Sequence, residues 1–112
     1  MDRKEMVRQY KETPRPAGVY VVRHRATGRT LLGSSPDAPA MLNRIRAQLR
    51  MKGHPNRTLQ ADWDSGEPAD FDFEVLDLVD QTDRADVDVS AELEALEALW
   101  RDELGLSADP GY

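Results

Sequence analysis

Two short apolar segments separated by a turn, between residues 18 and 34, constrain the fold of this chain more than any other feature. The first begins with Gly18-Val19-Tyr20, the second ends with Leu31-Leu32-Gly33-Ser34, and the turn falls at Ala26-Thr27-Gly28. Apolar and β-branched residues on both sides of a glycine-containing turn are typical of a β-hairpin. Strand alternation then places Tyr20 on the same face as Val22 and opposite Val19 and Val21.

Helical periodicity is clearest in residues 40–52, where Met41, Leu42, Ile45 and Leu49 share one face. We expect Gly53 to end this helix and Ser90 to cap the last one. The other expected elements are a helix over residues 2–12 within an N-terminal segment 1–13, a helix from Asn56 to about Trp63, a strand over residues 71–79, an acidic loop over residues 80–89 and a helix from Ser90 to Leu104. This order predicts one α+β domain over residues 1–112, a three-stranded antiparallel sheet flanked by helices.

Charge is distributed very unevenly along the chain. Residues 1–60 hold 13 Lys/Arg and 4 Asp/Glu, whereas residues 61–112 hold 2 Lys/Arg and 17 Asp/Glu, and the total is −6. A basic face that could bind DNA is therefore compatible with an acidic protein. The alternative is that the two halves neutralise each other, within one fold or across a homodimer.

The composition also bears on location and chemistry. There is no cysteine, which excludes disulfides and thiolate metal sites and favours a reducing, cytoplasmic setting. No apolar run approaches the roughly 18 residues of a membrane span, so we expect no contact with a membrane.

The hairpin resembles the two short motifs of the GIY-YIG nuclease family, in Gly18-Val19-Tyr20 and in Leu31-Leu32-Gly33. The resemblance extends over most of the chain, through residues 49–60, Ala61-Asp62-Trp63, the Phe71–Leu76 segment, Glu97-Ala98-Leu99-Trp100 and Gly111-Tyr112. It implies a GIY-YIG-like fold, here with an added N-terminal helix, and phosphodiester hydrolysis assisted by one Mg²⁺ or Mn²⁺ ion. Such chemistry needs a nucleophile and neutralisation of the developing phosphoryl charge.

The resemblance assigns roles to residues of the hairpin. Tyr20 matches the first motif's tyrosine and is the candidate catalytic group, although it could equally be an ordinary strand tyrosine. Leu31 replaces the second motif's tyrosine, and leucine can neither donate nor accept a proton. Gly18 and Gly33 are kept as structural motif residues, and Ser34 could bond a phosphate.

Two further site residues are expected on helices. Met41 stands at the family's usual arginine position, and Arg44, one turn later, is the candidate replacement although it lies far from the apolar face. Ile45 replaces a histidine often found there, and His54 is expected to be a surface residue. Glu97 lies at the edge of the apolar stripe of the last helix and is the candidate metal ligand, or a residue of a structural ion pair.

The sequence is compatible with three functions, of which some are enzymatic and others are not. The first is a degenerate nuclease-like protein that binds nucleic acid with weak or no cleavage, since lost cooperating groups leave little activity. Its binding residues would be Ser34, Arg46, Arg50, Lys52 and Arg57. The second is an active Mg²⁺- or Mn²⁺-dependent DNA endonuclease, and the third is a protein-interaction module that uses its acidic half.

Overall fold

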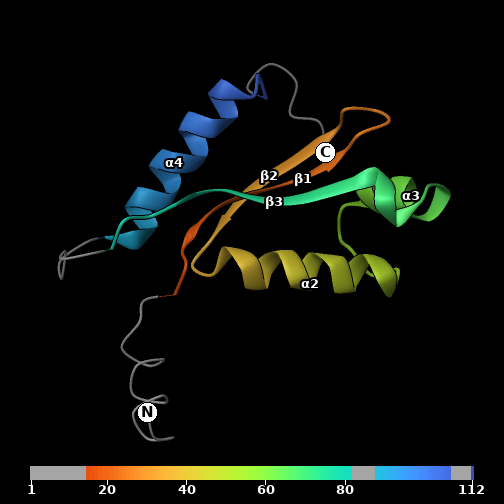
Figure 1. The fold of residues 1–112 in the computed structure, drawn as a ribbon, viewed down its shortest axis with the longest axis horizontal. Helices are drawn as coiled ribbons and strands as arrows, with labels where there is room; N and C mark the ends of the chain where they lie inside the picture. Colours follow the sequence, from red (N-terminus) through yellow and green to blue (C-terminus); the bar gives the residue numbers. More distant parts are fainter. Residues whose placement is uncertain (1–14, 82–87, 107–111) are drawn as a thin grey trace, which may run out of the picture.

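The computed structural model describes residues 15–81, 88–106 and 112 of the chain. The expected helix over residues 2–12 and most of the acidic segment 80–89 lie outside these residues. Figure 1 shows a central sheet with helices on both of its faces. None of the helices in the described ranges has the length and apolar composition needed to span a bilayer.

The sheet is three-stranded and antiparallel, as predicted. Strand β1 (Gly18–His24) pairs with β2 (Thr30–Ser35) and with β3 (Phe71–Leu78), so β1 is central and β2 and β3 are the edges. In the hairpin Tyr20 lies opposite Gly33, and Val22 lies opposite Leu31. This register places Tyr20 and Val22 on one face, as the alternation required.

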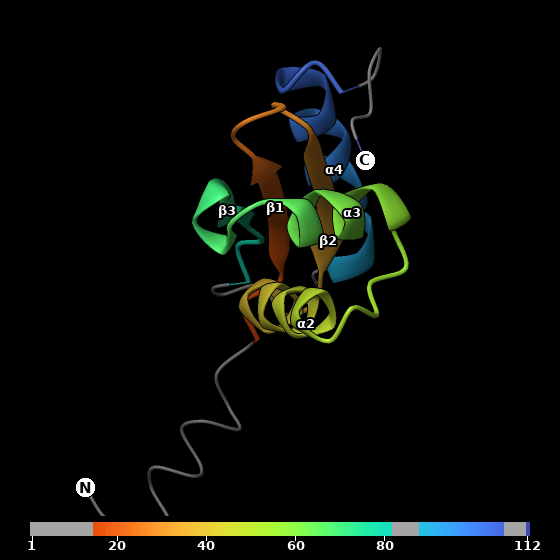
Figure 2. The same cartoon turned by 90° about the vertical axis from the view of Figure 1, so that its right-hand side faces the viewer.

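Two helices cover the two faces of the sheet. Helix α2 (Ala38–Arg50) packs on the Tyr20 face, and α4 (Val89–Glu103) packs on the other, as the two views in Figures 1 and 2 show. Helix α3 (Arg57–Ser65) and the short 3₁₀ turn η1 (Pro68–Asp70) connect α2 to β3. The architecture is therefore α+β, a small antiparallel sheet flanked by helices.

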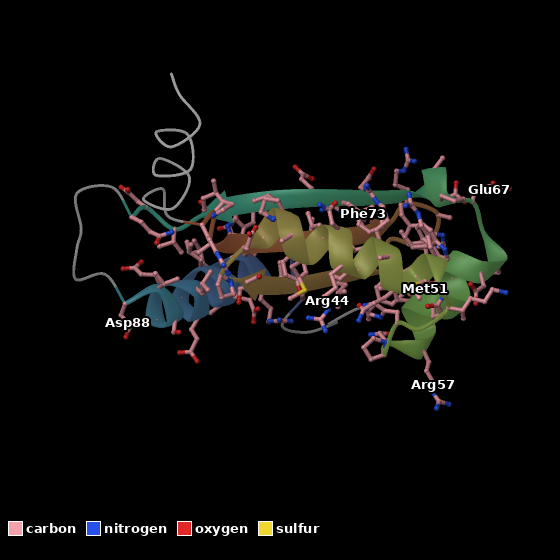
Figure 3. The ribbon with its side chains drawn as sticks, turned by 90° about the horizontal axis from the view of Figure 1, so that it is seen from below. Arg44, Met51, Arg57, Glu67, Phe73 and Asp88 are labelled. Carbon is pink, nitrogen blue, oxygen red and sulfur yellow. The ribbon has the colours of Figure 1, made fainter. Side chains whose placement is uncertain are left out.

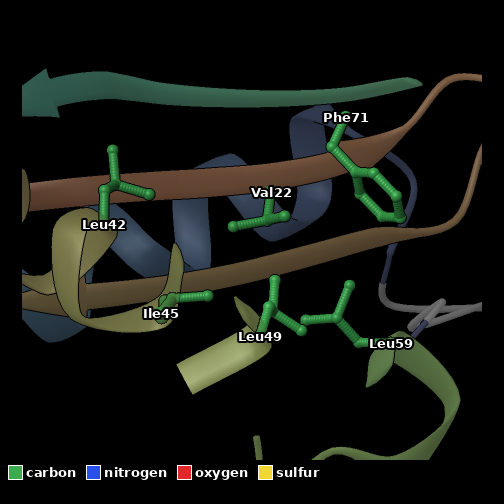
Figure 4. Packing of buried hydrophobic residues seen from close by; sticks show 6 residues of the cluster. All are labelled: Val22, Leu42, Ile45, Leu49, Leu59 and Phe71. Carbon is green, nitrogen blue, oxygen red and sulfur yellow. The ribbon is translucent and has the colours of Figure 1, made fainter. Parts of the chain in front are cut away.

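The main core lies between α2 and the sheet. It is built from apolar side chains of both strands and helices, which Figure 4 shows at close range: Val22, Leu42, Ile45, Leu49, Leu59 and Phe71. Leu49 and Leu59 are fully buried, which explains why α2 and α3 are held together at this end of the sheet. Removal of such residues from water is the main stabilising term for a domain of this size.

A second cluster lies between the sheet and α4, around Val19, Leu32 and Leu106. A register shift between Val19 and Tyr20 places Leu76 in this cluster and leaves Asp77 opposite Val19. The carboxylate of Asp77 accepts a hydrogen bond from the indole N–H of Trp100, with 3.1 Å between the two atoms. The bulge therefore fixes α4 against β3 through one polar contact as well as apolar packing.

Three predicted helix ends were wrong by one or two residues. Helix α2 begins earlier than residue 40 because Asp37 caps it, accepting a hydrogen bond from the N–H of Ala40. It also ends earlier, because Lys52 and not Gly53 takes the left-handed conformation, with φ of 59°. Helix α4 is capped by Asp88, which accepts from the N–H of Ala91, so Ser90 is not its cap.

The predicted cap of α3 was correct. The side chain of Asn56 accepts a hydrogen bond from the N–H of Leu59 at 3.1 Å. The cap directs Leu59 into the main core.

Candidate functional site

Tyr20 lies in the middle of β1, with its ring across the backbone of Gly33. A Cβ atom at position 33 would lie 2.6 Å from Cζ of Tyr20 and even closer to its hydroxyl oxygen. Only glycine leaves room for the ring there. Because β2 is an edge strand, the ring is directed toward the open β2 side of the sheet.

Gly18, the other motif glycine, also has a structural role. It is buried at the start of β1, and a Cβ there would collide with the backbone oxygen of Asp77. Both glycines therefore permit a close approach of neighbouring groups.

Leu31 belongs to the apolar packing of the sheet. It lies opposite Val22 and packs, half-buried, against the main core. Its side chain has no polar atom, so this position contributes no proton transfer. The place of a second motif tyrosine is taken here by a packing residue.

The charge of Glu97 acts on Tyr20. Burial raises the pKa of the Tyr20 phenol, and the neighbouring carboxylate of Glu97 raises it further. Tyr20 is therefore protonated at neutral pH, and it can donate a hydrogen bond but carries no nucleophilic phenolate.

Glu97 occupies the predicted edge of the apolar stripe on α4. Leu93 one turn before it is buried, and its own side chain is 32% exposed. Its carboxylate is 3.5 Å from the guanidinium of Arg101, one turn further along the helix. The half-buried acid thus has a positively charged partner within α4.

Glu97 is the carboxylate that would hold a divalent ion at this place, together with waters and a substrate phosphate. Within the described ranges no group of three or more His, Asp or Glu side chains gathers as a metal site. Mg²⁺ takes oxygen ligands and is usually bound by one or two carboxylates together with substrate phosphates. Glu97 offers one such carboxylate, which lies 3.5 Å from the guanidinium of Arg101.

The structure also places the two candidates on α2. Met41 is half-buried and packs against the main core, and Ile45 belongs to that core with 3% exposure. Arg44 is exposed, and Figure 3 shows it on the side of α2 away from β3 and Phe73. It makes no ion pair with any residue that the structure describes, so its guanidinium is available to a ligand on the β2 side.

Ser34 lies on the other face of the sheet from Tyr20. It pairs with Val19, whose side chain is in the α4 cluster. Neighbouring residues of a strand point to opposite faces, so Ser34 and Gly33 cannot serve the same face. The structure does not bring Ser34 and Tyr20 together.

The four predicted basic residues behave in two ways. The guanidinium of Arg46 stacks on the ring of Phe73, with its Cζ 4.4 Å from the ring centroid. The other three, Arg50, Lys52 and Arg57, are exposed and form no ion pair within the described part of the chain.

These cations form a continuous basic segment. They run from the end of α2 through the following loop to the first residue of α3. No acidic residue occurs between Asp37 and Asp62, so nothing in this segment neutralises them locally. Arg57 and Arg44 both lie on the side of the molecule away from β3 (Figure 3).

His54 holds the loop between α2 and α3 in shape. Its backbone N–H donates to the side-chain oxygen of Gln60 at 3.1 Å, and its Nδ1 accepts from the N–H of Asn56 at 3.0 Å. Burial lowers the pKa of the imidazole. His54 is thus half-buried and structural, where the sequence suggested a surface residue.

Sequence reasoning missed a polar cluster centred on Asp62 of α3. Its carboxylate accepts from Nη1 of Arg29 at 3.2 and 3.0 Å and from the hydroxyl of Tyr112 at 2.6 Å. Nδ1 of the buried His24 lies 3.7 Å from it and hydrogen-bonds to the hydroxyl of Thr27 at 2.8 Å. The sequence contains no motif or spacing that predicts this cluster, because its members come from segments far apart in the chain.

The electrostatics of the Asp62 cluster favour the contact that holds Tyr112 against α3. Burial would raise the pKa of Asp62, but hydrogen bonds from Tyr112 and Arg29 and the positive charge of Arg29 lower it overall. Burial and Asp62 raise the pKa of the Tyr112 phenol far above its ordinary range. The phenol is held as a neutral donor, so the cluster fastens residue 112 to the hairpin and α3.

No family model and no curated protein matches this chain. Two solved structures resemble it. One is the catalytic domain of the homing endonuclease I-TevI, with 18% identity, a TM-score of 0.61 and coverage of 80% of this chain and 88% of that chain. The other is a glutamate-to-alanine mutant of that catalytic domain, with 18% identity, a TM-score of 0.66 and coverage of 87% and 91%. At this identity the likeness establishes the fold, which is GIY-YIG-like.

Proposed function

We propose that this chain is a divergent GIY-YIG protein that binds nucleic acid, DNA in the first instance, with weak or no phosphodiester cleavage. The single observation that carries the proposal is a set of exposed cations on α2, the following loop and the start of α3 that form no ion pair with any residue the structure describes: Arg44, Arg50, Lys52 and Arg57. Cations without local partners gain most from phosphate contacts, because they release counterions from the nucleic acid.

Charge on the other side of the molecule orients the ligand. Helix α4 carries most of its exposed charge as acid, with Glu94, Asp102 and Glu103 in the exposed class. It covers the face of the sheet opposite α2, so a polyanion is repelled there and attracted to the α2 side (Figure 1). The fold likeness to an endonuclease catalytic domain supports a nucleic acid as the polyanion.

The arrangement around Tyr20 argues for weak cleavage. Leu31 and Met41 pack in the core where polar groups would be needed, and the Tyr20 phenol is kept protonated beside a carboxylate. Phosphodiester hydrolysis requires several groups that act as a unit, so losing members costs most of the rate.

The test is a salt titration of binding. Fluorescently labelled single- and double-stranded DNA is titrated with wild type, Arg50→Gln and Arg57→Gln by fluorescence anisotropy. Each variant should weaken binding to both ligands and lower the salt slope by about one. Arg25→Gln is the matched control, since Arg25 is exposed at the hairpin but paired with Asp72 at 3.6 Å.

Three outcomes would redirect the proposal. Variants that bind like wild type would exclude the α2 surface as the binding site. Salt-sensitive self-association without DNA binding would favour an interaction module or homodimer that uses the acidic half. DNA cutting in Mg²⁺ or Mn²⁺ that is lost in both Glu97→Ala and Tyr20→Phe would make the protein an active endonuclease.

A further inference from the structure

A row of aromatic rings lies on the α2 face of the sheet and ends at the edge strand β3. The ring of Phe71 contacts those of His24 and Trp63, with centroid distances of 4.6 and 5.2 Å. Trp63 also meets Phe73 edge to face, at 6.2 Å and 80°. His24 and Phe71 are buried, whereas Trp63 and Phe73 are partly exposed. The buried rings therefore hold in place two outer rings that solvent reaches.

Arg46 of α2 covers the outer end of this row. Its guanidinium carbon lies 4.4 Å from the centroid of the Phe73 ring. Asp72 and Glu74 flank Phe73 in the sequence, but neighbours in a strand point to opposite faces. In the described ranges Arg46 forms no ion pair, so its charge is left for an anionic ligand. A guanidinium is planar and has two faces, and only one of them can lie on Phe73.

The indole N–H of Trp63 adds a polar group beside Phe73. It forms no hydrogen bond with any residue that the structure describes. None of the buried side-chain nitrogen and oxygen atoms in the described ranges lacks a partner, so this unpaired N–H is open to solvent. An indole N–H is a donor only, and an acceptor atom on a ligand would pair with it.

The charge around this place favours a phosphate chain. Arg50 follows Arg46 by one turn, and residues i and i+4 are neighbours on a helix. Arg50 is exposed, and α2 contains no acidic residue. A base in a duplex is already paired and stacked, so only an unpaired base can stack on a protein side chain.

We propose that the Arg46–Phe73 pair is a stacking site for an unpaired base of a single-stranded nucleic acid. The inference rests on the proposed nucleic-acid binding and names the kind of strand that this surface takes. The base lies on the face of the Arg46 guanidinium that Phe73 does not cover. Trp63 donates to an acceptor of the bound nucleotide, and Arg50 contacts the adjoining phosphate. Every base has a π face, so the site selects unpaired bases and not a sequence.

The first test compares two ligands on the wild-type protein. Fluorescence anisotropy measures the binding of a labelled single-stranded oligothymidylate and of an abasic strand with the same number of phosphates. Stacking adds affinity only where a base is present, so the oligothymidylate should bind about tenfold more tightly. Equal affinity for the two strands would overturn the inference.

The second test repeats this comparison with variants. Phe73→Leu removes the ring but keeps an apolar side chain, and Arg46→Lys keeps the charge but not the planar group. Each should reduce the preference for the oligothymidylate to about twofold and leave the salt slope unchanged. Arg50→Gln is the matched control, which should lower the salt slope by about one on both strands and keep the full preference.

Thermal melting of each variant checks that it is folded. If Phe73→Leu is not folded, the wild-type comparison and Arg46→Lys still decide the matter. Folded variants that keep the full preference for the oligothymidylate would overturn the inference, and so would a loss of equal size on duplex DNA.

The two tests separate this inference from the proposed function. Binding of the oligothymidylate and the abasic strand with equal affinity, weakened by Arg50→Gln, would leave phosphate binding by α2 in place and overturn only the stacking site. Absence of binding to either strand and to duplex DNA would overturn the proposed function, and the inference with it.

Discussion

Replacement of Gly33 by alanine should displace the ring of Tyr20. The new methyl group would lie 2.6 Å from Cζ of Tyr20, whereas non-bonded carbons are comfortable at about 3.5 to 4.0 Å. The ring must therefore move by about 1 Å. It cannot move inward without overpacking the main core, and outward movement exposes a half-buried aromatic ring. Either route should lower the free energy of unfolding by about 1 to 3 kcal/mol.

Urea unfolding of Gly33→Ala measures that loss, and Gly53→Ala is the control. A Cβ at position 53 would find its nearest neighbour, the oxygen of Gln48, at 4.0 Å. The control should therefore change the unfolding free energy by less than about 1 kcal/mol. Repeating Gly33→Ala in a Tyr20→Leu background removes the colliding atoms, so the cost should largely vanish in this double-mutant cycle.

The titration of Tyr20 gives an independent readout. An outward ring loses the burial and the nearby Glu97 charge that raise its pKa, so phenolate absorbance should appear at lower pH in Gly33→Ala. The reasoning is refuted if Gly33→Ala is as stable as wild type, or if its cost persists unchanged when Tyr20 is leucine.

The pKa of Asp62 is lowered by folding, so its contribution to stability is present above the ordinary carboxyl pKa and lost as pH falls through the lower folded value. In Asp62→Asn the urea midpoint should depend less on pH below about pH 4, and a pH dependence equal to that of wild type would contradict the role of Asp62 in this cluster. Tyr112→Phe removes one donor to Asp62 and should cost about 1 to 2 kcal/mol in the same unfolding assay. Lys52→Gly relieves a left-handed residue and should raise the unfolding free energy by up to about 1 kcal/mol while weakening DNA binding. Trp100→Phe leaves the Asp77 carboxylate without its indole donor and should cost about 1 to 3 kcal/mol by urea unfolding, with part of the loss recovered in Trp100→Phe/Asp77→Leu.

The elements of the fold follow closely from local patterns. The hairpin, the apolar face of α2 and the third strand were all predicted, because alternation and helical periodicity report directly which side of an element is buried. The cap at Asn56 was also correct. The errors concern the exact ends of helices, where neighbouring residues compete for one capping position: Asp88 instead of Ser90, and Lys52 instead of Gly53.

The candidate site was harder to predict from the sequence than the fold. The motif residues Tyr20, Gly33 and Glu97 were named in advance, and their roles remain predictions that the proposed experiments test. Ser34 was named as a residue that could bond a phosphate, and its position on the strand turns it to the face covered by α4. Alternation could have shown this, because Ser34 and Gly33 are adjacent in the strand.

Sequence alone determined which segments become strands and helices and which of their faces are apolar, because those properties depend on residues a few positions apart. Only the tertiary structure decided which distant charges meet. Asp62 binds Arg29 and Tyr112 from far along the chain, and the charge of Glu97 on α4 helps to raise the pKa of Tyr20 on β1. Such encounters depend on the register of the strands and the packing of the helices, and no local pattern encodes them.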